Sequence, residues 1–352
     1  MDYYKMQDGL KFLLQNRNNG DVSYIDGRDF PKSDFNYTET FYFIEKHLNN
    51  KYHPCVNLGA ALSGDGLLTD HGVAHVQDVI RHSGDIITDV NQLTGYEIYI
   101  LLLSIHFHDV GNITGRKEHE NKIWDIMNEL NDALPLSIPE KQFICDIATA
   151  HGGYFENDKD TIKHINADEI YAGVKIRPKI LAAILRFADE ISDDFTRSDA
   201  TVKIPKANEI YHAYSKVLDP ISVAGDTIQF HYRIPISMTK KKMGKNNGEE
   251  FLYDEILGRL AKCMRELEYC KKYSNGLIKP NSISVAIDFL EDKTFRIKQG
   301  AGDNFKLSLQ GYPDSSTHQL STYMELQNDP VRSIKPLRYK DGNELSQKKW
   351  EE

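Results

Sequence analysis

The chain has 352 residues, of which 40% are hydrophobic and 27% are charged, a composition typical of a globular protein rather than a disordered one. Because this length exceeds that of most single domains, we expect two domains or one domain with a large extension. The net charge of -9 at pH 7 argues against a broad surface for extended nucleic acid, since phosphate backbones need clustered Lys and Arg.

The N-terminus and the cysteines indicate the compartment. The first residues contain no basic segment followed by an apolar one, and the apolar runs are too short to span a membrane. The four cysteines form no CxxC pair, which favours reduced thiols over a disulfide framework. We therefore expect a cytoplasmic protein with no membrane partner.

Helical patterns dominate the chain to about residue 195. The aromatic-rich segment 35–48 predicts an amphipathic helix. Apolar residues at helical spacing predict a second helix over residues 71–82, with Asp70 as its N-cap.

Three further helices are indicated by their first residues. Capping-box patterns at 94–97 and 137–140 each predict the start of a helix. The run that follows the first box, residues 98–107, is apolar nearly all round and predicts a buried central helix. The pair Arg177-Pro178 opens another helix, because Pro is well tolerated in a first turn.

After about residue 200 the pattern becomes that of an α+β region. Residues 227–238 and 282–290 alternate and are rich in β-branched and aromatic side chains, so we predict two strands there. Residues 251–273 between them predict a long amphipathic helix. Two strands do not form a stable sheet alone, so they need further strands, the helical domain or another subunit. Residues 239–250 are predicted to be a polar, Lys-rich loop, and the tail after about residue 328 is expected to be mobile.

The histidines carry the chemical signal. Eight of the thirteen fall between residues 71 and 164, and several lie at helix ends beside acidic residues. The buried central helix ends at His108-Asp109, where a carboxylate next to an imidazole needs a partner. A divalent cation bound by both side chains is such a partner, and it lowers the pKa of a bound water. A His-Asp pair is common by chance, so this pair indicates a metal site only together with its context.

Structural roles compete with the functional ones. His71 and His75 could line one face of a surface helix, and Asp189 could be a solvated helix residue. His106 lies within the apolar run and is interpreted as a packed core residue. His151 could cap its helix before the two glycines that follow it.

The order of these residues resembles the HD-domain phosphohydrolase superfamily. The resemblance covers roughly residues 50–200 and rests on TDHGVAHVQDVI, LSIHFHDVGN, His119-Glu120, ATAHGG and ILRFADEISDD. It implies an HD-type all-helical bundle, and together with the α+β pattern after residue 200 we predict a mostly α protein in which this bundle carries a C-terminal α+β appendage. We accordingly predict an N-terminal helical extension, an HD domain, an α+β region and a polar tail, at residues 1–66, 67–199, 200–328 and 329–352.

The resemblance implies a metal site formed by His75, His108, Asp109 and Asp189. His71 is the alternative for the first ligand, but His75 is preferred because an aliphatic residue follows it four positions on. Neutral imidazoles and carboxylates together suit Mn, Fe, Co, Ni or Zn, and Mg alone less well. We expect one or two divalent ions per site.

The resemblance also implies catalytic roles for Asp109, His119 and His151. Asp109 would bind the metal and orient the attacking water. The two histidines match positions where many members have extra histidines, which bind a second metal or contact the phosphate and act as acid or base.

Three other residues concern the substrate. Asn112 stands where many members have Lys, a departure that removes one candidate phosphate contact. Arg116 and Lys117 could supply positive charge instead, although a solvated turn is an equal alternative for them. His71 is placed on the rim as a further substrate-binding residue.

The sequence therefore predicts a metal-dependent phosphohydrolase that acts on a phosphoester or phosphoanhydride bond of a small substrate, preferably a nucleotide. The first alternative is a regulatory module that senses a nucleotide and signals to a partner. The second is a single-strand nuclease, with a role in bacterial defence as one setting. The C-terminal region could mediate contact with a second copy or another protein.

Overall fold

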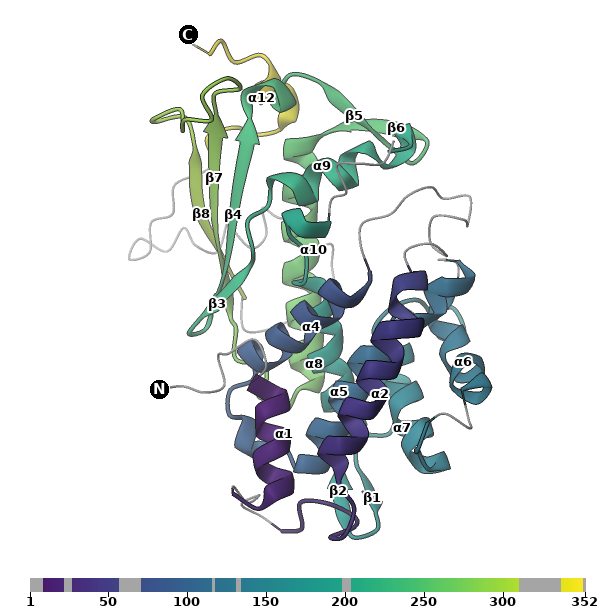
Figure 1. The fold of residues 1–352 in the computed structure, drawn as a ribbon. Coiled ribbons are helices and arrows are strands. Elements are labelled where there is room, and N and C mark those ends of the chain that lie inside the picture. The colour runs from purple at the N-terminus through teal and green to yellow at the C-terminus, as the bar shows by residue number, and fades with distance from the viewer. Residues whose placement is uncertain are drawn as a thin grey trace. The chain divides into compact units, whose positions relative to one another are not determined.

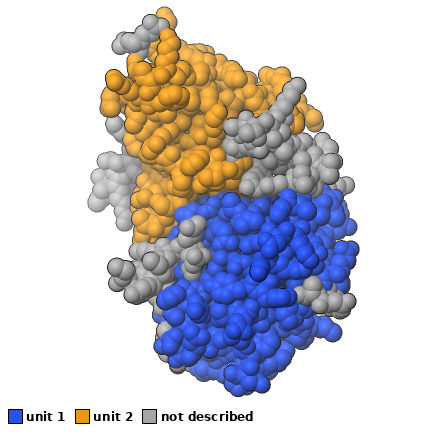
Figure 2. Space-filling view, viewed as in Figure 1, with its two compact units in different colours: residues 1–65, 71–192, 270–279 blue, residues 66–70, 193–269, 280–352 orange. Residues whose placement is uncertain are grey.

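The computed structural model describes two compact units. The residues that it describes are 9–21, 27–56, 71–115, 118–130, 134–197, 204–309 and 337–350. Figure 2 colours the first unit, residues 1–65, 71–192 and 270–279, and the second, residues 66–70, 193–269 and 280–352. The expected Asp70 N-cap and the residues Arg116 and Lys117 lie outside the described residues.

The first unit is helical apart from one short hairpin, as Figure 1 shows. Its α-helices are α1 (Gly9–Asn19), α2 (Tyr37–Lys51), α4 (Val73–Ile86), α5 (Gly95–Phe107), α6 (Ile123–Glu129), α7 (Ile138–Thr149) and α8 (Pro178–Glu190). Short 3-10 turns and the hairpin complete it: η2 (Val90–Gln92), η3 (Val110–Thr114), η4 (His119–Lys122), η6 (Thr161–His164), β1 (Glu169–Tyr171) and β2 (Val174–Ile176).

Helix α5 forms the centre of the first unit. All of its 13 residues are buried, as expected for a helix that is apolar on every side. Helices α1, α2, α4, α7 and α8 all pack against it. The predicted capping boxes are both present, with Thr94 and Glu97 at the start of α5 and with Ser137 and Glu140 at the start of α7. The core of this unit could therefore be predicted from the sequence.

A buried ion pair joins the first turns of α5 and α8. The Glu97 carboxylate accepts bonds from the Arg177 backbone N–H, from its Nε at 2.8 Å and from its NH2 at 2.7 Å. Both helices have 13 residues, so they rise by about the same 20 Å from this clamp. Their far ends carry His108-Asp109 and Asp189, which the common length brings to one level.

The second unit contains a four-stranded sheet in the order β3-β4-β7-β8. The predicted strands appear as β4 (Thr227–Pro235) and β7 (Ser282–Leu290), which pair in parallel. Parallel neighbours need a crossover connection, and α10 (Leu252–Tyr273) lies in it. The additional strands that the pair requires are β3 (Ser222–Ala224) and β8 (Asp303–Ser308), both antiparallel to their neighbours. The other elements are η7 (Phe195–Arg197), η8 (Lys206–Asn208), α9 (Glu209–Val217), η9 (Ile236–Thr239), β5 (Lys242–Lys245), β6 (Gly248–Phe251) and α12 (Gly342–Ser346).

Two segments of this unit differ from expectation. The predicted Lys-rich loop is a hairpin, in which β5 and β6 pair from Lys242↔Phe251 to Lys245↔Gly248. Asn246 makes this tight turn possible, because Asn tolerates the left-handed conformation it adopts there at φ 49°. Within the tail, residues 337–350 pack in place instead of being mobile, since Leu345 is fully buried and Gly342 N–H donates to Asp254.

Two global expectations concern membranes and thiols. No helix in the described part of the chain is both long and apolar enough to cross a membrane. None of the four cysteines, all of which lie in the described residues, forms a disulfide, and Cys263 and Cys270 are buried on α10.

The clamp between α5 and α8 generates a prediction on stability. Replacing Arg177 by Ala leaves Glu97, of which 1% is exposed, as an uncompensated buried charge. Breaking such a pair costs roughly 3–5 kcal/mol, which we expect as the loss in free energy of unfolding measured with urea. Lys175→Ala is the control, because its pair with Asp168 is more than half exposed and should contribute about 0–1 kcal/mol. Equal effects of the two substitutions would contradict the prediction.

Candidate metal centre

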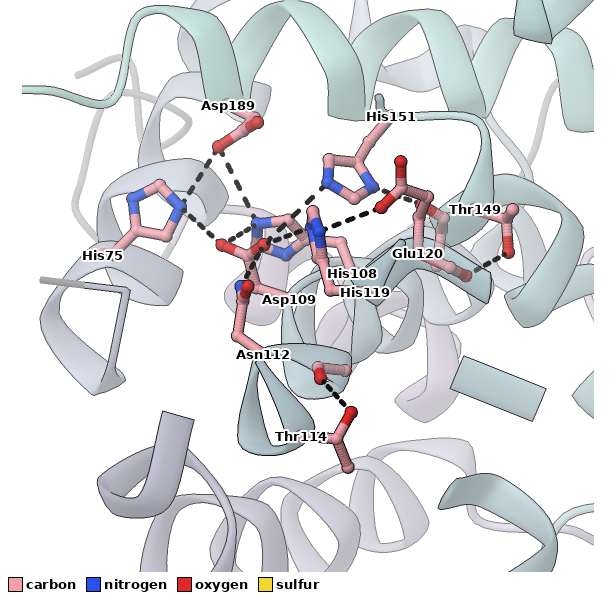
Figure 3. A network of polar contacts seen from close by, with 12 residues as sticks. His75, His108, Asp109, Asn112, Thr114, His119, Glu120, Thr149, His151 and Asp189 are labelled. Carbon is pink, nitrogen blue, oxygen red and sulfur yellow. Dashed lines mark hydrogen bonds and ion pairs between the residues drawn. The ribbon is translucent and has the colours of Figure 1, made fainter. Parts of the chain in front are cut away.

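Six side chains from five segments of the first unit converge at one point (Figure 3). His75 comes from α4, Asp189 from the last turn of α8, and His119 begins η4. His108 and Asp109 follow α5, and His151 follows α7. These are the four predicted ligands together with both predicted catalytic histidines.

The carboxylate of Asp109 lies at the centre and turns one oxygen to each side. Its Oδ2 lies 3.3 Å from His108 Nε2 and 3.6 Å from His75 Nε2. Its Oδ1 lies 3.1 Å from His119 Nε2 and 3.9 Å from His151 Nε2. Only 6% of Asp109 is exposed, so these imidazoles are the surroundings of a buried charge.

Asp189 closes the His75 side of the cluster. Its Oδ1 lies 3.1 Å from His75 Nε2 and 3.7 Å from His108 Nε2. The side chain is 28% exposed, which makes it the most open of these acidic and histidine groups. It therefore lies where a ligand from solvent can reach the centre.

Three of the imidazoles are fixed with Nε2 directed inward. His108 Nδ1 lies 2.6 Å from the Ile105 carbonyl oxygen, and His151 Nδ1 lies 2.5 Å from that of Ala148. His119 Nδ1 lies 2.9 Å from Glu120 Oε2. Carbonyl and carboxylate oxygens only accept, so Nδ1 must carry the proton in each ring. This is the tautomer that presents a free Nε2 lone pair when the imidazole is neutral. His151 thus caps its helix, as the structural alternative predicted, while its Nε2 lies 3.9 Å from Asp109 Oδ1.

Burial and the neighbouring charges shift the pKa of each of these groups. Burial opposes charge on His108, but the charges and hydrogen bonds of Asp109 and Asp189 together outweigh it and raise the pKa of this imidazole to about 10. Burial likewise disfavours ionised Asp109, but His108 and His119 hold its pKa well below the usual range. The pKa of His119 rises to about 9, because bonds to Asp109 and Glu120 outweigh its burial. The pKa of His151 falls to about 4 through burial and the positive charge on His108 and His119.

The arrangement fits a divalent cation. Two groups of buried side chains, His75 with His108 and Asp109, and Asp109 with His119 and His151, have donor atoms within 4.8 Å of one another. Three buried nitrogens form no hydrogen bond within the described part of the chain: Nδ1 and Nε2 of His75, and Nε2 of His108. Among the described residues, the charged partners of Asp109 and Asp189 are imidazoles, and neither carboxylate pairs with Lys or Arg. These groups can therefore hold a metal ion that would balance both carboxylates.

Two glycines let the supporting backbone approach closely. A Cβ on Gly111 would lie 1.9 Å from the carbonyl oxygen of His119, so only Gly lets η3 pack against η4 there. A Cβ on Gly153 would lie 1.7 Å from Glu120 Oε1, and this glycine also has φ +66°. Glu120 thus occupies space that a side chain at position 153 would fill. The sequence shows the glycines but not these contacts, which come from distant segments.

Two further histidines among the described residues, His71 and His106, belong to neither of the two groups. His71 is buried, and its ring lies 5.5 Å from that of His75. His106 is a core residue, as interpreted, and it belongs to a polar chain that sequence reasoning missed. Its Nδ1 lies 3.3 Å from His53 and its Nε2 lies 3.3 Å from Glu45, which pairs with Lys11 at 2.7 Å.

Comparison with known proteins gives one match. The model of the HD-CE family matches residues 65–262, more than half of the chain. The chain belongs to the HD-CE family. The match includes all six converging side chains, and it continues past residue 199, through β4 and the hairpin into α10. No curated protein and no solved structure matches the chain.

The contact between Gly153 and Glu120 generates a second prediction. Gly153→Ala forces a residue with a side chain into a left-handed conformation and displaces Glu120, so that His119 loses its Nδ1 partner. We expect a loss of about 1–3 kcal/mol in the free energy of unfolding. Weaker binding of Mn²⁺ in calorimetric titration should accompany it. Gly152→Ala is the matched control, since its Cβ would meet no atom within 4 Å. Equal behaviour of the two variants would disprove this role of Gly153.

Proposed function

We propose that this HD-CE protein is an HD-type metal-dependent phosphohydrolase that cleaves a phosphoester or phosphoanhydride bond in a small substrate, preferably a nucleotide. The observation that carries the proposal is the convergence of four imidazoles and two carboxylates from five segments around Asp109. Their resemblance to the HD motif supports the same chemistry. A bound divalent cation would lower the pKa of a water molecule and polarise a phosphoryl oxygen.

In this proposal His75, His108, Asp109 and Asp189 hold the first cation. The Oδ1 of Asp109, with His119 and His151, holds a second one or faces the substrate. Mn, Fe, Co, Ni and Zn suit these nitrogen and oxygen donors, and Mg suits them less well. Asp109 touches both sides, so it both binds a cation and orients the group that attacks phosphorus.

The two histidines on the Oδ1 side differ in charge, which supports different roles. In the absence of a cation the bonds to Asp109 and Glu120 raise the pKa of His119 to about 9, so a His119 that faces the substrate instead of binding a second cation can donate a proton to a leaving oxygen. His151, with its pKa of about 4, is uncharged near neutral pH and has Nδ1 committed to a carbonyl. It therefore offers Nε2 as a cation ligand or a proton acceptor. Separation of two pKa values by their surroundings is typical of acid and base pairs.

The substrate class follows from charge. The net charge of -9 disfavours a long anionic polymer but not a small anion drawn to a local cation. Asp189 is the open side of the cluster, where such an anion would enter. Arg116 and Lys117 remain proposed phosphate contacts, and His71 a proposed rim residue. A second copy or another protein is proposed to bind through the C-terminal region.

A nucleotide screen tests the proposed activity. Purified protein with Mn, Co, Ni or Mg should release phosphate, pyrophosphate or triphosphate from a mono-, di-, tri- or cyclic nucleotide. Asp109→Ala should abolish release at unchanged helix content, because both cation groups lose their shared oxygen ligand. Asp158→Ala is the control, since this more exposed aspartate also pairs with a histidine, His164, but lies in neither converging group.

Other outcomes of the screen would replace the proposal. Binding of a nucleotide without turnover under any metal would identify a sensing module. Preferential cleavage of single-stranded DNA or RNA would identify a nuclease.

The acid and base roles generate a further prediction. His119→Ala and His151→Ala should each lower kcat by about 100- to 10,000-fold, the usual contribution of a positioned proton donor or acceptor. The variants should keep their circular dichroism spectrum and melting temperature to within a few degrees. His164→Ala should keep full turnover, because its imidazole pairs with Asp158. Full turnover in both site variants would exclude a catalytic role for either.

A further inference from the structure

Asn112 contacts the central carboxylate from a position with little conformational freedom. It lies in η3, directly after Asp109, and its backbone N–H donates to the Asp109 carbonyl at 3.0 Å. The same turn is packed against η4 through Gly111. Asn112 is fully buried, so its amide is fixed beside Asp109 by the backbone of two adjacent turns.

The amide has one possible orientation. Asn112 Nδ2 lies 2.9 Å from Asp109 Oδ1 and donates to it. An ionised carboxylate only accepts hydrogen bonds, so the NH₂ group must face it and the amide oxygen must point elsewhere. The bond fixes the carboxylate plane, with Oδ1 toward His119 and Oδ2 toward His108.

The other end of the amide is unsatisfied. Asn112 Oδ1 is buried and accepts no hydrogen bond from any residue in the described segments. A buried hydrogen-bond acceptor that receives no hydrogen bond is costly in free energy. Because this atom lies beside candidate cation ligands, a bound cation or its water could satisfy it. Amide oxygens are good ligands for hard cations and good acceptors for the water they carry. Among the described contacts of Asp109 Oδ1, Asn112 is uncharged, whereas His119 and His151 can each carry a positive charge that would repel a cation.

We propose that Asn112 is a positioning residue that fixes the direction of the two Asp109 carboxylate oxygens and thereby sets the affinity of the Oδ1 side for a divalent cation. This inference rests on the proposed function, because it takes the converging side chains to be cation ligands. One site would comprise His75, His108, Asp189 and Oδ2 of Asp109. The other would comprise His119, His151 and Oδ1 of Asp109, whose direction depends on the Asn112 amide.

Cation counting tests this role without reference to turnover. Chelator-treated protein is titrated with Mn²⁺ by calorimetry, and bound Mn is counted after equilibrium dialysis. The wild type should bind two ions. In Asn112→Leu the side chain has a similar size but no hydrogen-bond donor. One ion should still bind with the wild-type Kd, while the Kd of the other should rise by about 10- to 100-fold. This is the usual effect of removing a hydrogen-bond partner that orients a metal ligand. His119→Ala should show the same pattern, because it removes a ligand of that second site.

Two further variants complete the test. Thr114→Val removes an exposed hydroxyl from the same turn, which bonds only the Gly111 carbonyl, and it should keep both ions at wild-type Kd. Asn112→Ser is a smaller polar replacement that cannot reach Asp109, and it decides the matter if the Leu variant does not fold in chelator. A wild type with one ion, or Asn112 variants with two at unchanged Kd, would overturn the role of Asn112. A wild type that binds no ion would instead overturn the proposed metal centre.

Discussion

The burial of the Asp109 carboxylate is the constraint on which the site depends. The charge lies at the end of α5, a helix with no exposed residue, and only 6% of Asp109 is exposed to water. An isolated buried carboxylate would become protonated or unfold its surroundings, so partners must reach it from other segments. Those partners are imidazoles that follow or belong to α4, η4 and α7. Helices far apart in sequence must therefore end at this one point. The caps and lengths of these helices, and the glycines beside them, place their ends there.

Much of this arrangement could be predicted, because its signals are local. Both capping boxes, the apolar run of α5 and the strands β4 and β7 depend on residues a few positions apart. The contacts behind the ligands could not be predicted in this way. The bond from Asn112 to Asp109 depends on a 3-10 turn, and the fit of Glu120 under Gly153 joins positions 33 apart. Asn112 was read from the sequence as a lost phosphate contact, whereas it contacts the carboxylate itself.

In the second unit, too, the local elements could be predicted from the sequence, whereas the pairing of distant segments could not. Alternation predicted β4 and β7, but not that they are parallel neighbours, because register depends on the path of the chain between them. The hairpin of β5 and β6 was missed because its strands are rich in Lys and Glu, which are depleted in strands generally. Pairing across the tight turn at Asn246 outweighs that preference. The family match extends into this unit as far as residue 262, so the first part of the predicted α+β region belongs to the family pattern.

A comparison of two buried histidine clusters in the first unit shows why only one is assigned to a cation. In the cluster of Glu45, His106 and His53, the carboxylate pairs with the amino group of Lys11 at 2.7 Å, so its charge is already balanced. Asp109 and Asp189 have no such partner among the described residues, and balance there requires protonated imidazoles. A cation that replaces those protons satisfies both carboxylates and frees the Nε2 lone pairs to bind it. Cation binding at Asp109 should therefore release protons and stabilise the fold. The Glu45 cluster needs no bound cation, because the chain itself supplies the positive charge of Lys11.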